Sequence, residues 1–167
     1  MLRDFPLPAS VAHAVQGRSG PAAKLRPCAT VLLLRDGSDG PEVFLLRRSR
    51  SMAFAPRMHV FPGGGVDPRD ADPDLPWAGP DPATWSAALG APPAQARELV
   101  CAAVRELFEE CGVLLAGPDD QQVVHDLSGE QWERDRRELS GHSLALRDVL
   151  LRRSLVLRSD LLRPWAH

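Results

Sequence analysis

The longest helical alternation of apolar and polar positions in this chain covers residues 94–113. At 3.6 residues per turn, one arc of this segment is apolar and carries Val100, Ala103, Val104, Leu107, Phe108 and Cys111. The opposite arc carries Glu98, Ala102, Glu106, Glu109 and Glu110. Pro92 and Pro93 precede the segment and Gly112 follows its last turn, and these residues favour a helix start and a left-handed helix end. The pattern predicts one amphipathic helix with an acidic face.

Shorter apolar runs upstream predict strands. Residues 28–35 form an apolar, partly β-branched run that is typical of a buried strand, and residues 42–47 form a second run. Residues 36–41 between them are rich in Asp, Gly and Pro, so we expect an antiparallel hairpin with a longer loop. Residues 59–61 predict a third strand, which the glycines of residues 62–65 end.

Downstream of the long helix the pattern is mainly helical. A short strand is expected just after Val113. Residues 127–139 predict a polar helix opening at Ser128, and residues 143–153 predict an amphipathic helix. Residues 154–163 are ambiguous between strand and helix.

Composition and charge narrow the protein class. A chain of 167 residues fits one domain, and 44% hydrophobic with 25% charged residues is ordinary for a globular protein. The net charge of −2 gives no sign of a nucleic-acid or membrane footprint, and no apolar run approaches the ~18 residues of a membrane span. Cys28, Cys101 and Cys111 are odd in number and lack metal-knuckle spacing. We expect buried, reduced thiols and a cytoplasmic location.

The acidic face of the long helix is the first candidate for chemistry. Glu106, Glu109 and Glu110 are three and four residues apart, so their side chains are neighbours. Two of them lie at the C-terminal end, where the helix dipole disfavours negative charge. A divalent cation would relieve this repulsion, and Mg²⁺ binds through a few carboxylates together with water and substrate phosphates. The ordinary alternative is a solvated acidic surface.

The wider sequence around these glutamates favours a metal site over a solvated acidic surface. Residues 105–113 read R-E-L-F-E-E-C-G-V and match, position for position, the R-E-U-x-E-E-x-G-U half of the nudix box, where U is a bulky aliphatic residue. The segment F-P-G-G-G at residues 61–65 resembles the opening of the same box. The chain therefore resembles the nudix hydrolase family. The resemblance implies an α/β fold, in which a mixed sheet is sandwiched by helices, and hydrolysis of a nucleoside diphosphate linked to another group.

The resemblance also implies roles for individual residues. Glu106, Glu109 and Glu110 would bind Mg²⁺ or Mn²⁺, and one of them or a carboxylate elsewhere would be the general base. Arg105 would orient a carboxylate of this cluster. Substrate contacts are expected at Arg48, Gly63, Gly64 and Gly65, and the substrate would be a small nucleotide-like molecule. His59, His125 and His142 lack ligand spacing and are expected to be ordinary histidines.

The chain departs from the usual box in one respect. The separation of Gly64 from Arg105 is much longer than in the family, so residues 67–93 are an insertion. It could be a lid, a specificity loop or a packed surface excursion. The box also contains an earlier glutamate. Counted from the glycines its position falls on Asp70, and counted back from Arg105 it falls on Arg97, beside Glu98. The choice among these three stays open.

One branch of the family is especially similar. A long insertion followed by C-A-A-V-R-E-L-F-E-E-C-G-V-L-L resembles the branch that includes coenzyme A diphosphatases. Arg48-Ser49 and residues 61–64 fit the coenzyme A signature of that branch, whereas Ala53, Arg57 and His59 replace its internal Arg, Gly and Val. Coenzyme A or an acyl-coenzyme A is the expected substrate, with nucleotide sugars, dinucleotides and capped RNA as alternatives.

The expected organisation is an irregular lead-in at residues 1–26 and a single nudix-like domain at 27–167, with the insertion 67–93 and a helical region 127–153. Fewer strands are expected after the box than a complete nudix sheet requires, so the fold is expected to be incomplete at the C-terminus. A fragment, a naturally short chain and a homodimer that completes the sheet are the explanations, because an open edge invites pairing. A non-catalytic nudix-like binding domain and a helical interaction module without a hairpin at 28–47 are the remaining alternatives.

Overall fold

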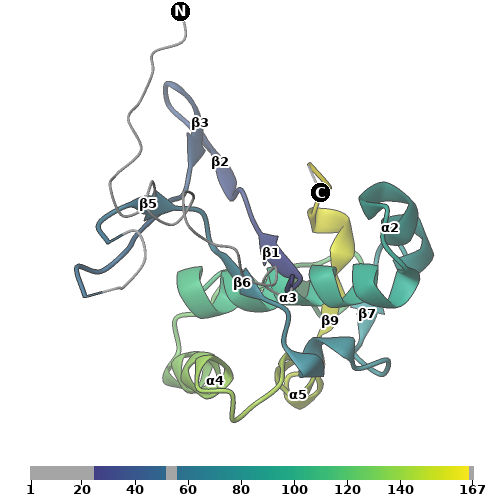
Figure 1. The fold of residues 1–167 in the computed structure, drawn as a ribbon. Coiled ribbons are helices and arrows are strands. Elements are labelled where there is room, and N and C mark those ends of the chain that lie inside the picture. Colours follow the sequence, from purple (N-terminus) through teal and green to yellow (C-terminus); the bar gives the residue numbers. More distant parts are fainter. Residues whose placement is uncertain (1–24, 52–55, 166–167) are drawn as a thin grey trace, which may run out of the picture.

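A computed structural model describes residues 25–51 and 56–165. The lead-in expected at residues 1–26 therefore lies almost entirely outside the described residues. Figure 1 shows helix α3 (Pro93–Cys111) running through the centre of the described chain. Strands β1 (Cys28–Thr30) and β6 (Gly63–Gly65) lie on one side of α3, and helices α4 (Glu130–Ser140) and α5 (Leu146–Arg152) lie on the other.

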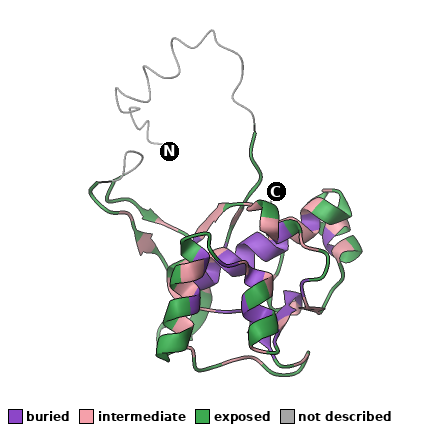
Figure 2. Cartoon of the chain, turned by 90° about the horizontal axis from the view of Figure 1, so that it is seen from below, coloured by how far each residue is buried: buried purple, intermediate pink, exposed green. Residues whose placement is uncertain are grey.

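Helix α3 confirms the predicted long helix and its end. Gly112 takes the left-handed conformation (φ 68°, ψ 20°), and its N–H donates to the carbonyl of Phe108 at 3.0 Å. The alternative of a solvated acidic arc is not supported, because Ala102 on that arc is buried and so is the neighbouring Arg105. A short 3₁₀ helix, η1 (Pro68–Ala71), packs against this side of α3. The central helix is thus covered on more than one face, as the burial colours of Figure 2 show.

The predicted hairpin is present, but it differs in detail. Strands β2 (Leu34–Gly37) and β3 (Gly40–Val43) pair antiparallel with Leu34 opposite Val43 and Gly37 opposite Gly40. Only two residues lie between the strands, so the predicted longer loop is wrong. The predicted buried strand at 28–35 is also wrong: it is divided between β1 and β2, and Val31 is its one buried residue.

The other N-terminal strands form two more pairs. β1 pairs antiparallel with β6, with Cys28 opposite Gly65 and Thr30 opposite Gly63. β4 (Leu46–Arg47) pairs antiparallel with β5 (His59–Val60), which confirms the strand predicted around residue 59. In Figure 1 the β2–β3 and β4–β5 pairs extend away from the helices.

A three-stranded mixed sheet closes the other half of the fold. β9 (Val156–Arg158) lies between β7 (Trp77–Ala78), to which it is parallel, and β8 (Ala116–Gly117), to which it is antiparallel. The ambiguous segment 154–163 is therefore a strand followed by a 3₁₀ turn, η2 (Ser159–Leu161).

The insertion 67–93 is a packed part of the fold. It supplies η1, β7 and helix α2 (Pro82–Leu89), and α2 packs on α3. Leu75 and Trp85 from the insertion are buried in the main core. Of the readings open for this segment, the structure favours the packed excursion over a lid.

Two clusters of buried side chains lie on α3. The larger cluster joins one side of α3 to α4, α5, β8, β9 and the insertion, and includes Phe108, Leu150 and Leu157. The smaller joins the other side to the β1 region through Val31, Ala103 and Leu107. Among the described helices, none combines the length and apolar character that crossing a membrane would require.

Candidate functional site

Arg105 lies at the centre of the predicted site, with its side chain only 5% exposed. Its Nη1 donates to Oε1 of Glu106 at 2.8 Å and to Oε1 of Glu109 at 3.0 Å. Its Nη2 donates to the carbonyl of Gly65 at 2.8 Å, and its Nε donates to Oδ1 of Asp70 at 3.0 Å. Burial disfavours the charged guanidinium, but the bonds to these carboxylates outweigh it and raise the pKa of Arg105. One side chain therefore fixes two of the three predicted glutamates.

Asp70 is one of the three residues among which the two counts along the sequence left the earlier acidic position open. It is fully buried, and its carboxylate accepts three hydrogen bonds from Arg105, at 3.0, 3.3 and 3.1 Å, and one from the N–H of Asp67 at 2.8 Å. Arg97 instead donates to backbone carbonyls of the insertion, at Asp72, Pro73 and Leu75. The count from the glycines thus finds the partner of Arg105. The count back from Arg105 fails because the insertion separates the two halves of the motif.

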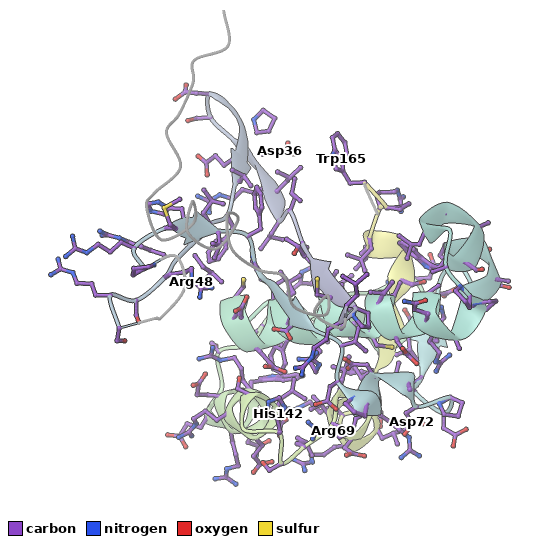
Figure 3. The ribbon with its side chains drawn as sticks, in the orientation of Figure 1. Asp36, Arg48, Arg69, Asp72, His142 and Trp165 are labelled. Carbon is purple, nitrogen blue, oxygen red and sulfur yellow. The ribbon has the colours of Figure 1, made fainter. Side chains whose placement is uncertain are left out.

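The three glycines of β6 each touch this cluster. The N–H of Gly63 donates to Oε2 of Glu110 at 2.9 Å. A Cβ on Gly64 would overlap the carboxylate of Glu106, so only glycine lets that carboxylate lie against the strand. The carbonyl of Gly65 accepts from Arg105. Figure 3 shows the side chains that fill the space between β6 and α3.

The glutamates are not a solvated acidic surface. The side chains of Glu106 and Glu109 are 13% and 11% exposed, and Glu110 alone is open to solvent. Burial raises the pKa of Glu106, the nearby charges of Glu109 and Glu110 raise it further, and Arg105 opposes the rise. The three carboxylates therefore repel one another in a partly dry environment, which is where a cation would be most stabilising.

The chemistry of the donors suits a hard divalent cation, since all are carboxylate oxygens. Within residues 25–51 and 56–165, however, no three His, Cys, Asp or Glu side chains converge as a ready metal-binding group. Glu106 and Glu109 face Arg105, whereas Glu110 faces Gly63. Binding a metal ion here would require the glutamate side chains to turn toward a common point.

The remaining candidate residues lie outside this cluster. Arg48 is on the β4–β5 pair, where its N–H donates to the carbonyl of Met58 at 2.9 Å. Its expected substrate contact stays a prediction. Cys28 is exposed, contrary to expectation, because β1 is short and lies at the surface. Cys101 is buried and Cys111 partly so, and burial raises the pKa of these thiols to about 12 and about 11.

Sequence reasoning missed the part that α4 plays at the end of α3. Arg136 donates from Nη1 to the carbonyl of Glu109 at 2.9 Å, and it is held by Glu133 at 2.8 Å. That carbonyl is among the last four of the helix, which lack partners within the helix. A cavity of about 250 Å³, lined partly by Glu110, Trp132 and Arg136, opens beside it. The helical pattern of residues 127–139 predicted α4 but gave no sign of where it docks.

Comparison with known proteins gives one informative similarity. No family model matches the chain. Among solved structures, the chain is similar to the crystal structure of a NUDIX hydrolase from Alicyclobacillus acidocaldarius, with a TM-score of 0.58 and 26% sequence identity. The match covers 81% of this chain and 58% of that protein, so the chain spans little more than half of its neighbour's length. The described chain has a nudix-like mixed α/β fold, and this similarity supports the resemblance to the nudix hydrolase family that the motif at residues 105–113 indicates.

Proposed function

We propose that the chain is a metal-dependent nudix-type hydrolase that cleaves the diphosphate linkage of a nucleoside diphosphate derivative. The observation that carries the proposal is the arrangement around Arg105. This one buried guanidinium holds Glu106 and Glu109 beside the glycines of β6, and the N–H of Gly63 binds Glu110. A surface cluster of glutamates would need no such arrangement.

Each part of the site has a chemical task in this proposal. Glu106, Glu109 and Glu110 would hold Mg²⁺ or Mn²⁺, which when bound neutralises phosphate charge and acidifies or orients a water molecule. Arg105 keeps two of these carboxylates in place. At Gly65 no atom lies within 4 Å of where a Cβ would stand, so a phosphate could approach that backbone closely, whereas Glu106 lies against Gly64. The expected substrate contacts of Gly63 and Gly64 require Glu110 and Glu106 to move aside. One of the three glutamates, or another carboxylate, serves as the general base.

For the substrate, we propose coenzyme A or an acyl-coenzyme A first. The support is the partial signature at Arg48-Ser49 and residues 61–64 together with the long insertion. Nucleotide sugars, dinucleotides and capped RNA share the same diphosphate chemistry and belong in the same screen. The three free cysteines fit a cytoplasmic location, which we also propose.

The test is hydrolysis of coenzyme A, ADP-ribose and a dinucleotide in Mg²⁺ or Mn²⁺, followed by chromatography of the products. Glu109→Gln should lower the rate by about 10²–10⁴ if Glu109 is the general base, and at least as far if it is a metal ligand. The control is Glu98→Gln, which changes the same residue type about three turns earlier on the same helix and should leave the rate near wild type. Full turnover by Glu109→Gln would exclude the assignment, and binding of every substrate without turnover would indicate a non-catalytic binding domain.

A further inference from the structure

The β2–β3 hairpin carries an apolar face that stays exposed in the described chain. Leu34 pairs with Val43, and the N–H of Phe44 donates to the carbonyl of Leu33 at 2.9 Å, so the register extends to these two residues, and Leu32 and Leu45 come next along each segment. Alternate residues of a strand share a face. The shared face therefore consists of four residues, each between 41% and 61% exposed: Leu32, Leu34, Val43 and Leu45. We call these four residues the hairpin face.

The two ends of this hairpin have opposite charge. Asp36 and Asp39 lie at the turn, and the charges of Arg35 and Glu42 behind them cancel in a cross-strand ion pair at 2.6 Å. Beyond the other end, Arg47 in β4 and Arg50 in the turn that follows it are exposed. Figure 3 labels Asp36 near the turn and Arg48 at the distant end. The hairpin is thus acidic at its tip and basic at its base, with apolar residues between.

We propose that a second copy of this chain packs on the hairpin face, with the two hairpins antiparallel about a two-fold axis. In such an isologous contact each surface meets its own copy, so the surface must be self-complementary. Apolar residues then meet apolar residues. The acidic tip of each hairpin meets the basic base of the other, so this charge match occurs twice in the dimer. A partner of uniform charge would match one end of the hairpin and oppose the other.

The order of residues along the hairpin also favours this arrangement. The apolar residues are central and the charges peripheral, which is the usual anatomy of a protein interface. Neither β2 nor β3 pairs with a further strand among residues 25–51 and 56–165, so no described neighbour stands in the way of a second hairpin. The arrangement is independent of the proposed hydrolase activity, because none of its residues belongs to the glutamate cluster.

The first experiment measures the molar mass of the full chain by light scattering during size-exclusion chromatography, over a series of concentrations. The wild-type chain should be dimeric, and Val43→Glu should raise the dimer dissociation constant at least about tenfold, since it buries a charge without a partner. The matched control is Phe44→Glu, which changes the adjacent, similarly exposed residue on the opposite face and should remain dimeric. Circular dichroism confirms that both variants are folded. A monomeric wild-type chain, or equal weakening by both variants, would overturn the proposal.

A second experiment tests the antiparallel arrangement. One variant carries Asp36→Arg and Asp39→Arg, so that both ends of its hairpin are basic, and the other carries Arg47→Asp and Arg50→Asp, so that both ends are acidic. Each variant alone should be mainly monomeric, because like charges then face each other at both ends. An equimolar mixture should form a heterodimer. If the mixture stays monomeric while the wild-type chain is dimeric, the tip-to-base arrangement is wrong.

Discussion

The guanidinium of Arg105 donates hydrogen bonds to four different groups, which its several N–H donors make possible. Its planar fork presents five N–H donors, and these meet Asp70, Glu106, Glu109 and the carbonyl of Gly65. A lysine could not contact Asp70 through two nitrogens and still reach both glutamates. Since the ion pair with Asp70 is buried, removing one partner leaves a charge without compensation.

The exchange Asp70→Ala should therefore be strongly destabilising. We expect the free energy of unfolding to fall by about 3–5 kcal/mol, as when one member of a buried ion pair is removed. Urea unfolding followed by circular dichroism measures this change. The control is Asp74→Ala in the same insertion, where the side chain is exposed and the change should stay within about 0.5 kcal/mol. Equal effects from the two variants would show that the buried pair does not stabilise the fold.

Asp67 provides a pH-dependent contribution at the same scale. Two hydrogen bonds from the guanidinium of Arg69, at 2.8 Å and 2.7 Å, hold the pKa of Asp67 well below its usual value. A carboxylate whose pKa is lowered by folding stabilises the protein above its unfolded pKa, near 4, and this contribution is lost as the pH falls toward the folded value. Asp67→Asn should thus cost about 1.5–3 kcal/mol at pH 6 and clearly less at pH 3. Denaturant unfolding of the wild-type chain and the variant at both pH values measures this difference. A larger loss of stability at pH 3 than at pH 6 would contradict the prediction.

The sequence was informative about some of these residues and silent about others. Arg105 and the three glutamates lie within one helix, whose regular geometry fixes which side chains are neighbours. Asp70 lies near the start of the insertion, and the rest of the insertion separates it from that helix, so its spacing from Arg105 carried no information. Arg136 comes from a separate helix, and the pattern of a helix shows which face is apolar but not which carbonyl its arginine will reach.

Strand β6 and helix α3 are held at a separation that only a bare backbone permits. Gly64→Ala would place a methyl group inside the space of the Glu106 carboxylate, so either the strand or Glu106 must move. We expect a loss of about 1–3 kcal/mol in stability, typical of overpacking, and at least tenfold weaker Mn²⁺ binding by titration. The control is Gly65→Ala, because a Cβ there meets no atom within 4 Å and should change neither property appreciably. If Gly64→Ala binds Mn²⁺ as tightly as the wild-type chain, the contact between Gly64 and Glu106 is not needed for metal binding.

At the scale of helices and strands, the elements that depend on local sequence signals were predicted best. The 3.6-residue period and Gly112 located α3 and its end, because both are local. The hairpin was predicted, but its tight turn was not. Gly37 and Gly40 were interpreted as loop residues, whereas in the structure they pair with each other at the ends of the two strands. Of the three-stranded sheet, only β8 was predicted, as the short strand expected just after Val113. Its strands have two or three residues each, too few for a periodic pattern, and β7 comes from the insertion.

At the scale of the whole molecule, burial is unevenly distributed. The larger cluster brings together α3, α4, α5, the mixed sheet and the insertion, whereas β2, β3, β4 and β5 contain no buried residue among those described. Figure 2 shows this contrast between the buried central helix and the exposed strand pairs. Local opening requires less free energy where fewer apolar side chains are buried. The hairpin should therefore open independently of the helical core.

Hydrogen exchange can test this division directly. Amides of residues 100–108 in α3 should exchange only through global unfolding, while amides of residues 34–43 should exchange far faster in dilute protein. If a second copy covers the hairpin face, protection of residues 34–43 should increase with protein concentration, and protection in α3 should not, because association stabilises only the segment it covers. Val43→Glu should abolish the concentration dependence and Phe44→Glu should preserve it. Equal protection of both segments in dilute protein would instead show that the hairpin and the core unfold as one cooperative unit.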